Sequence, residues 1–156
     1  VMVGMHPRLK SGFFASTLHT KKQREEEKAI REKAMELLKF VGLENYANEQ
    51  AGALSYGQQR LLEIVRGLAS DPKLILLDEP AAGMNSTEKV ELNYLLHKIL
   101  DRGVTILIVE HDMKLMMGVC DRIFVLNYGK KLAEGTPEEI QKNPEVIAAY
   151  LGGDET

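Results

Sequence analysis

Two apolar runs separated by a helical pattern constrain the fold of this chain more than any other feature. Leu74–Leu77 is an unbroken apolar run, and Val104–Val109 is a second. The segment from about Thr87 to Leu100 has apolar residues at helical spacing, with Asn85 or Ser86 as its cap. Continuous apolar strands are typical of parallel sheets covered on both faces. The alternation of strand, helix and strand therefore predicts an α/β fold with a parallel strand pair.

Polar side chains follow both runs: Asp78-Glu79 follows the first and Glu110-His111 the second. Ligands of open parallel sheets bind beyond the carboxyl ends of the strands. Neighbouring strand residues point to opposite faces, so Asp78 and Glu79 are expected to differ in role. Enzymes that transfer phosphoryl groups often use two carboxylates in different roles. One lies near Mg²⁺, and the other polarises the attacking water. His111 could then donate to a phosphate oxygen, while Glu110 receives no role. Taken alone, the acidic pair also fits a strand-end turn, and His111 a structural partner of Asp112.

A second helix is predicted to open at Ser55, upstream of the first apolar run. Ser55-Tyr56-Gly57-Gln58 fits the capping box S-x-x-Q, and an apolar stripe follows. Asp71-Pro72 ends the pattern. The unpaired N–H groups and the dipole of a helix N-terminus favour phosphate, although taken alone the segment also fits an ordinary helix start.

The rest of the chain divides into a helix-rich first half and a mixed second half. An amphipathic helix is predicted from about Lys22 to Val41, with Gly42 as its stop. Residues 1 to about 20 are expected to form loop and short helix. The later segments are a short helix at 113–119, a hairpin at 122–134, and helices opening at Thr136-Pro137 and Asn143-Pro144. We expect two subdomains, a helical one at 1–70 and an α/β one at 71–156.

Composition excludes several classes of protein. The chain has 156 residues and a net charge of −3, which argues against a nucleic-acid-binding surface. None of its apolar runs reaches the ~18–20 residues that span a bilayer. A single cysteine, Cys120, leaves no internal disulfide and fits a reducing cytoplasm.

Four motifs in register resemble those of the ATP-binding-cassette (ABC) ATPases. Leu54–Arg60 resembles the signature motif and Leu74–Pro80 resembles Walker B. Ala81–Asn85 occupies the position of the D-loop, and His111 matches the switch histidine. The resemblance covers about residues 50–135. It implies a partial P-loop NTPase (RecA-like) core preceded by a helical, signature-bearing subdomain.

The resemblance also implies a role for each motif with ATP and Mg²⁺ as cofactors. Asp78 would organise the metal, Glu79 would be the general base, and His111 would sense the γ-phosphate. The signature residues would face the nucleotide of a partner subunit; they are Ser55, Tyr56, Gly57 and Gln58. The D-loop residues would couple the two subunits; they are Ala82, Gly83 and Asn85.

The family resemblance further implies partners and a location. Two ATPase subunits, identical or different, would pair head to tail and drive transmembrane permease subunits docked on the helical subdomain. The protein would be cytoplasmic and peripheral at the inner face of the cell membrane, touching the membrane only through the permease and binding no nucleic acid. Tyr56, Ala81–Asn85 and the opening Val1–His6 resemble the branched-chain amino-acid importer group.

One family motif is missing from these residues. There is no G-x-x-x-x-G-K-[ST] loop, and Gly129-Lys130 is followed by Lys131. The adenine-stacking aromatic residue and the Q-loop glutamine are also absent. We therefore expect this chain alone neither to bind ATP tightly nor to hydrolyse it, and to expose apolar surface that favours self-association or low stability.

Two other functions compete with the transport ATPase. A non-catalytic interaction module would keep the docking surfaces of a cassette, but it has no need of Glu79 or His111. A DNA-maintenance ATPase of the coiled-coil group would need a long heptad arm before the signature motif. The helix at about 22–41 is too short for that arm.

Overall fold

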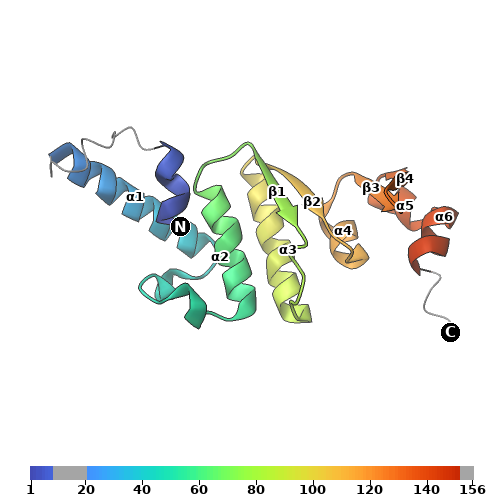
Figure 1. Ribbon diagram of the computed structural model, residues 1–156, viewed down its shortest axis with the longest axis horizontal. Coiled ribbons are helices and arrows are strands. Elements are labelled where there is room, and N and C mark those ends of the chain that lie inside the picture. Colours follow the sequence, from blue (N-terminus) through green and yellow to red (C-terminus); the bar gives the residue numbers. More distant parts are fainter. Residues whose placement is uncertain (9–20, 152–156) are drawn as a thin grey trace. The chain divides into compact units, whose positions relative to one another are not determined.

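The computed structural model describes residues 1–8 and 21–151, which belong to two compact units, Val1–Val109 and the residues from Glu110 onward (Figure 1). The first unit contains, in chain order, η1 (Met2–Arg8), α1 (Lys21–Phe40), η2 (Glu44–Tyr46), η3 (Ala51–Ala53), α2 (Tyr56–Leu68), β1 (Leu74–Asp78), α3 (Ser86–Asp101) and β2 (Thr105–Val109). The second contains α4 (Met113–Val119), β3 (Ile123–Asn127), β4 (Lys130–Gly135), α5 (Pro137–Gln141), α6 (Pro144–Val146) and η4 (Ile147–Leu151). The subdomain division near residue 71 remains a prediction.

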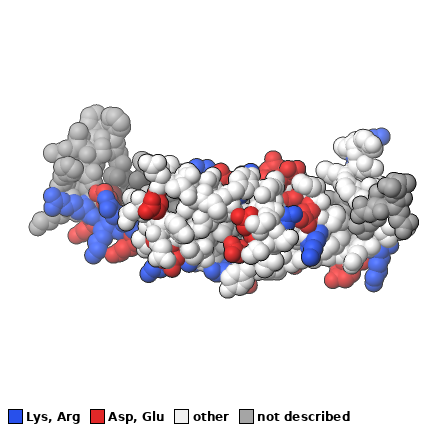
Figure 2. All heavy atoms as spheres, turned by 90° about the horizontal axis from the view of Figure 1, so that it is seen from below, with Lys and Arg blue, Asp and Glu red and all other residues white. Residues whose placement is uncertain are grey.

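Helix α1 confirms the predicted amphipathic helix to within one residue at each end. It stops before Gly42, whose φ of +72° is the left-handed conformation expected just beyond a helix. Its outer surface carries basic and acidic side chains that form ion pairs, such as Arg31–Glu27 at 3.4 Å and Lys33–Glu36 at 3.2 Å (Figure 2). Its inner face buries Ala34 and Leu37.

Helices α2 and α3 supply a large share of the core of the first unit. Their buried side chains are Leu61, Ile64, Val65, Leu68, Leu92, Leu95, Leu96 and Ile99. A methyl group placed on Gly67 of α2 would lie 3.3 Å from Cδ1 of Ile75, so α2 packs directly on β1. Gly4 of η1 meets α2 at the Arg66 carbonyl, which brings the start of the chain into the same core.

Strands β1 and β2 form the predicted parallel pair, in register from Leu74↔Thr105 to Asp78↔Val109. One face of the pair packs on the helices and buries Ile75. The other face is bare: Leu76 is 67% exposed and its partner Leu107 is 56% exposed. The expectation that both faces are covered is therefore wrong for the described residues, because they cover only the side of Ile75. The expectation of uncovered apolar surface is confirmed at the same place.

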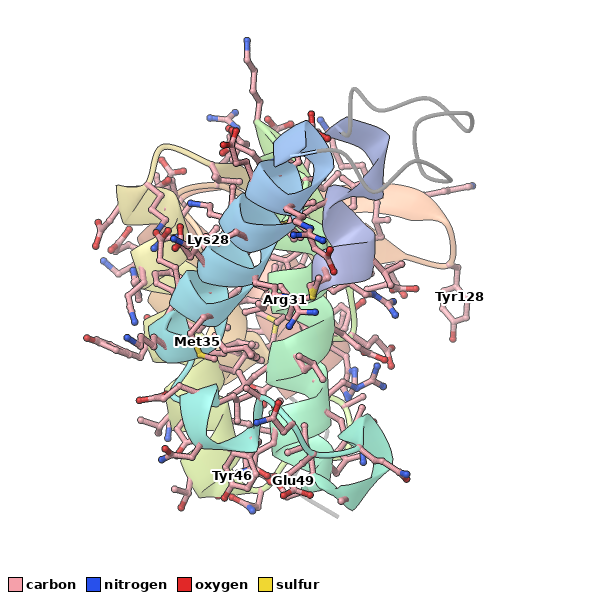
Figure 3. The ribbon with its side chains drawn as sticks, turned by 90° about the vertical axis from the view of Figure 1, so that its left-hand side faces the viewer. Lys28, Arg31, Met35, Tyr46, Glu49 and Tyr128 are labelled. Atoms are coloured by element: carbon pink, nitrogen blue, oxygen red, sulfur yellow. The ribbon has the colours of Figure 1, made fainter. Side chains whose placement is uncertain are left out.

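In the second unit, β3 and β4 form the predicted antiparallel hairpin. Its turn residues Tyr128 and Gly129 have φ of +46° and +75°, as in a two-residue type I′ turn. Tyr128 is almost entirely exposed and points away from the ribbon (Figure 3). Both Pro-led helices form as expected, with Thr136 and Asn143 as their caps. None of the helices in residues 1–8 and 21–151 is long and apolar enough to cross a membrane.

Candidate functional site

The first predicted site group lies where β1 ends. Asp78 is the last strand residue and pairs with Val109, and both Asp78 and Glu79 are exposed. Glu79 leaves the strand with a φ of +43°, which is uncommon for a residue with a side chain, while its N–H donates to the Val109 carbonyl at 2.8 Å. The backbone turn therefore directs two neighbouring carboxylates into solvent from one strand end. Such strained positions often carry function.

The chemistry of Asp78 fits the Mg²⁺ that the sequence motifs imply. Magnesium prefers oxygen ligands, and beside phosphates it takes only one or two carboxylates from the protein. An exposed carboxylate at the carboxyl end of a parallel strand meets this requirement. No cluster of three or more His, Cys, Asp or Glu that could hold a metal by itself occurs in the described part of the chain. Any metal at Asp78 would therefore share its coordination with a ligand such as a phosphate.

The second group lies at the N-terminus of α2, where the predicted capping box is confirmed. The Ser55 hydroxyl oxygen accepts from the N–H of Gln58 at 3.3 Å, and the Gln58 side-chain oxygen accepts from the N–H of Ser55 at 3.0 Å. Gln59 reaches back to the Leu54 carbonyl at 2.9 Å. The start of α2 is thus fixed by its own side chains, with Ser55 and Tyr56 exposed and Gly57 buried.

The tertiary structure brings this helix start against the third predicted group. A methyl group placed on Gly83 would lie 3.0 Å from Cε1 of Tyr56, and one placed on Gly57 would lie 2.5 Å from Oε1 of Glu88. The signature residues and the D-loop residues of one chain are therefore in direct contact. A side chain at Gly57 would displace the carboxylate of Glu88, and one at Gly83 would crowd the ring of Tyr56.

The D-loop segment is itself a tight turn between β1 and α3. The N–H of Ala82 donates to the Glu79 carbonyl at 3.1 Å, and Gly83 adopts a φ of +74°. Asn85, rather than Ser86, caps α3: its side-chain oxygen accepts from Thr87 at 2.9 Å and from Glu88 at 3.0 Å. The side-chain oxygen of Asn85 is consequently engaged in holding the helix start.

His111 belongs to the second unit and follows β2 by two residues. Its ring is 72% exposed, and its Nδ1 lies 3.6 Å from Oε2 of Glu110. Glu110, which received no role from the sequence, has a fully buried side chain, and its Oε2 accepts from the N–H groups of His111 at 2.9 Å and Asp112 at 3.2 Å. Glu110 therefore shapes the backbone that presents His111.

Two supporting residues escaped the sequence reasoning. Arg60 donates to the Tyr56 hydroxyl through Nε at 3.1 Å and Nη2 at 2.8 Å, and pairs with Glu63 at 2.9 Å. The spacing of Tyr56, Arg60 and Glu63 along one helix face was a readable signal. Glu88 completes the cap of α3 by accepting from the N–H of Asn85 at 3.0 Å. The capping-box spacing from Asn85 could have revealed Glu88, but not its contact with Gly57.

A hollow of about 470 Å³ opens on the helical part of the first unit. It is lined from α1 by Arg31 and Met35 and from the segment after α1 by Tyr46 and Glu49 (Figure 3). The lining thus combines apolar surface with one charge of each sign. Such a surface could receive a short segment of a partner protein.

Comparison with protein families gives two matches. A model described as "ABC transporter" matches residues 3–82, which is more than half of the chain. A second, described as "Branched-chain amino acid ATP-binding cassette transporter", matches residues 130–156. The two matches together include the signature motif, Walker B and the C-terminal segment.

Similar proteins agree with the family models. The chain is 47% identical over 153 residues to the high-affinity branched-chain amino acid transport ATP-binding protein LivG of Salmonella typhimurium, a match that covers 97% of this chain and 60% of the relative. It is 37% identical over 122 residues to the lipopolysaccharide export system ATP-binding protein LptB of Haemophilus influenzae, covering 78% and 51%. The chain thus spans about three-fifths of the length of the LivG relative.

Solved structures with the same fold include ATP-binding cassettes. The ADP conformation of MJ1267, an ATP-binding cassette of an ABC transporter, superposes with a TM-score of 0.76 at 28% identity, covering 97% of this chain and 62% of that chain. CbiO1 from Clostridium perfringens, part of the ABC transporter complex cbiONQ, gives a TM-score of 0.69 at 31% identity, covering 87% and 53%. These similarities confirm the predicted fold class.

Proposed function

Because this chain belongs to the ABC transporter family, we propose that it is part of the ATP-hydrolysing subunit of an importer for branched-chain amino acids. The identity with LivG over 97% of the chain supports the substrate class, and so does the family model at residues 130–156. The lower identity with LptB makes lipopolysaccharide export the weaker choice.

The proposed chemistry assigns different roles to the polar residues at the ends of β1 and β2. Bound Mg²⁺ would neutralise charge that develops on the transferred phosphate. Asp78 holds that ion through its carboxylate, and Glu79 accepts the proton of the attacking water as general base. His111 donates to a γ-phosphate oxygen, oriented by the backbone that Glu110 fixes.

The contact between the signature motif and the D-loop carries this proposal. Ser55, Tyr56, Gly57 and Gln58 form a helix start whose N–H groups favour a phosphate, here one bound by a second ATPase subunit. Ala82, Gly83 and Asn85 lie against that helix start and lead directly from Glu79. A nucleotide held at a head-to-tail dimer interface would then affect the position of both segments.

Transmembrane permease subunits are the second proposed partner, and they dock on the helical part of the first unit. The hollow lined by Arg31, Met35, Tyr46 and Glu49 supports this placement. A permease segment with an apolar side chain and charges of both signs would match it. The ATPase itself would then be held at the inner face of the membrane only through the permease.

Leucine uptake tests the proposal. In Salmonella lacking LivG, a LivG chimaera whose matching 153 residues are replaced by this chain should restore uptake. Replacing Glu79 by Gln should lower ATP turnover about 10²–10⁴-fold, because the general base is lost. Glu36→Gln, an exposed glutamate on α1, is the matched control and should leave turnover unchanged.

Two results would contradict the proposal. A stable chimaera that assembles with the permease but takes up no leucine would exclude this substrate class. Full turnover of the Glu79→Gln chimaera would exclude Glu79 as the base. The 156-residue chain by itself should release no phosphate from ATP, since it contains no phosphate-binding loop.

A further inference from the structure

The ring of Tyr56 lies directly on the backbone of Gly83. A methyl group on Gly83 would meet three ring atoms of Tyr56, namely Cε1 at 3.0 Å, Cζ at 3.4 Å and the hydroxyl oxygen at 3.5 Å. The φ of +74° at Gly83 turns the backbone into a conformation that side chains rarely allow. An aromatic ring on α2 and a glycine in the turn before α3 are therefore fitted to each other.

The ring is held in place from within α2. Arg60, one turn further along, donates two hydrogen bonds to the Tyr56 hydroxyl, and its guanidinium carbon lies 5.2 Å from the ring centroid. Glu63 accepts from Arg60 at 2.9 Å and holds the guanidinium in turn. The hydrogen bonds that Arg60 donates to Glu63 and Tyr56 also raise the pKa of Arg60. Contacts within α2 thus fix the orientation of the Tyr56 ring that lies against the turn.

A second contact runs in the opposite direction. Glu88, from the first turn of α3, lies against the Cα of Gly57 at the start of α2. The same carboxylate accepts from the N–H of Asn85 through its other oxygen, at 3.0 Å. A glycine at or just before each helix start therefore contacts a large side chain of the other helix. Two such contacts resist sliding and rotation better than one.

The turn that carries Gly83 is tied to Glu79. The N–H of Ala82 donates to the Glu79 carbonyl at 3.1 Å, and the N–H of Met84 to the Ala81 carbonyl at 3.1 Å. A displacement of Gly83 is passed through this short turn to the residue with the strained φ at the strand end. The route from Tyr56 to Glu79 contains only Gly83 and one hydrogen-bonded turn.

We propose that Tyr56 is a positioning residue that holds the turn at Ala82–Met84, and through it the backbone of Glu79, in register with the signature helix of the same chain. Its consequence for catalysis rests on the proposed function, in which Glu79 is the general base. Motion of α2 on meeting a nucleotide then reaches Glu79 within one subunit. The Tyr56 side chain contacts this turn, while the Tyr56 backbone belongs to the helix start proposed to face the partner's nucleotide.

Amide hydrogen exchange of the 156-residue chain tests the coupling without any ATPase activity. In Tyr56→Ala, exchange at Ala82 and Met84 should rise about tenfold relative to α3, because the turn opens locally. Tyr56→Phe keeps the ring and should restore protection. Tyr46→Ala is the matched control, since Tyr46 of η2 is 43% exposed and Tyr56 is 46% exposed.

Nuclear magnetic resonance supplies a second readout that does not depend on stability. Ring-current shifts at the Gly83 Hα atoms should be present in wild type and Tyr56→Phe, and absent in Tyr56→Leu. A uniform rise of exchange throughout the first unit would assign Tyr56 a merely structural role and overturn the proposal. Unchanged Gly83 shifts in Tyr56→Leu would overturn it as well. An inactive LivG chimaera would count against the proposed function alone, because neither readout uses ATP.

Discussion

The starts of α2 and α3 and the strand pair β1–β2 are neighbours in one unit, yet they are stabilised differently. Both helix starts carry complete capping boxes and contact each other through Gly57 and Gly83. The strand pair has full parallel register, but one of its faces leaves Leu76 and Leu107 mostly exposed. The helix starts satisfy their own polar groups and contact each other, whereas the strand pair packs on the helices through one face only.

This difference shows which part of the proposed site the chain can build by itself. The signature motif and D-loop meet within the described residues, so their geometry needs no further partner. The bare strand face is apolar surface of the kind that marks an interface or an aggregation-prone patch. The carboxylates at the end of β1 therefore sit on a strand that is only half supported.

The largest loss of stability is expected from truncating a side chain in the buried helical core. Leu96→Ala should lower the free energy of unfolding by about 2–5 kcal/mol, because Leu96 is fully buried in α3 and its loss leaves a cavity. Leu76→Ala should cost only about 0.5 kcal/mol, since its side chain is largely exposed on β1. Urea denaturation of both variants measures the difference.

Equal losses of unfolding free energy in these two variants would contradict the contrast between the core and the bare strand face. They would mean that something covers Leu76 in solution. Self-association is the expected source of such cover. Sedimentation should show wild type associating more strongly than Leu76→Lys, which places a charge on the bare face. A wild-type chain that is a compact, stable monomer would contradict the expected self-association.

An intermediate effect is expected at the start of α3. Asn85→Ala removes the acceptor for the N–H groups of Thr87 and Glu88 and should cost about 1 kcal/mol. Asn85→Asp keeps an acceptor and should cost much less. Thermal unfolding followed by circular dichroism tests both. Indistinguishable stabilities of the two variants would mean that the tertiary contacts, and not the cap, hold this helix start.

The smallest effect concerns the hairpin of the second unit, where Glu134 pairs with Arg122 and Lys131 beside the exposed side chains of Phe124 and Leu126. Arg122 and Lys131 hold the pKa of Glu134 below its usual 4.5, with the hydrogen bond from Arg122 as the largest cause. The folded-state pKa is lowered, so this contribution is present above about pH 4.5 and is lost as pH falls through the folded value.

A carboxyl titration by nuclear magnetic resonance measures the midpoint of Glu134. Arg122→Gln should move that midpoint upward, toward the usual value, with little change in stability because the pair lies at the surface. A midpoint that stays where it was would show that Arg122 does not hold the carboxylate in solution.

Sequence patterns predicted the elements well wherever the signal lies within a few residues. Helix α1 differs by one residue at each end, and α4 agrees at both ends. The caps at Ser55 and Thr136 were also predicted, since a capping box connects residues only three positions apart. Coverage of β1 was predicted wrongly because an apolar run reports what a strand can bury, and not what the chain supplies to cover it.

The sequence by itself determined where helices and strands begin and end, and which polar residues lie at their ends. Hydrogen-bond spacing and apolar periodicity are local, so they can be read without a structure. Only the tertiary structure placed Tyr56 on Gly83 and Glu88 on Gly57, and only it left Leu76 bare. Those outcomes depend on the path of the backbone between distant segments, which brings two helix starts together and covers just one face of a strand pair.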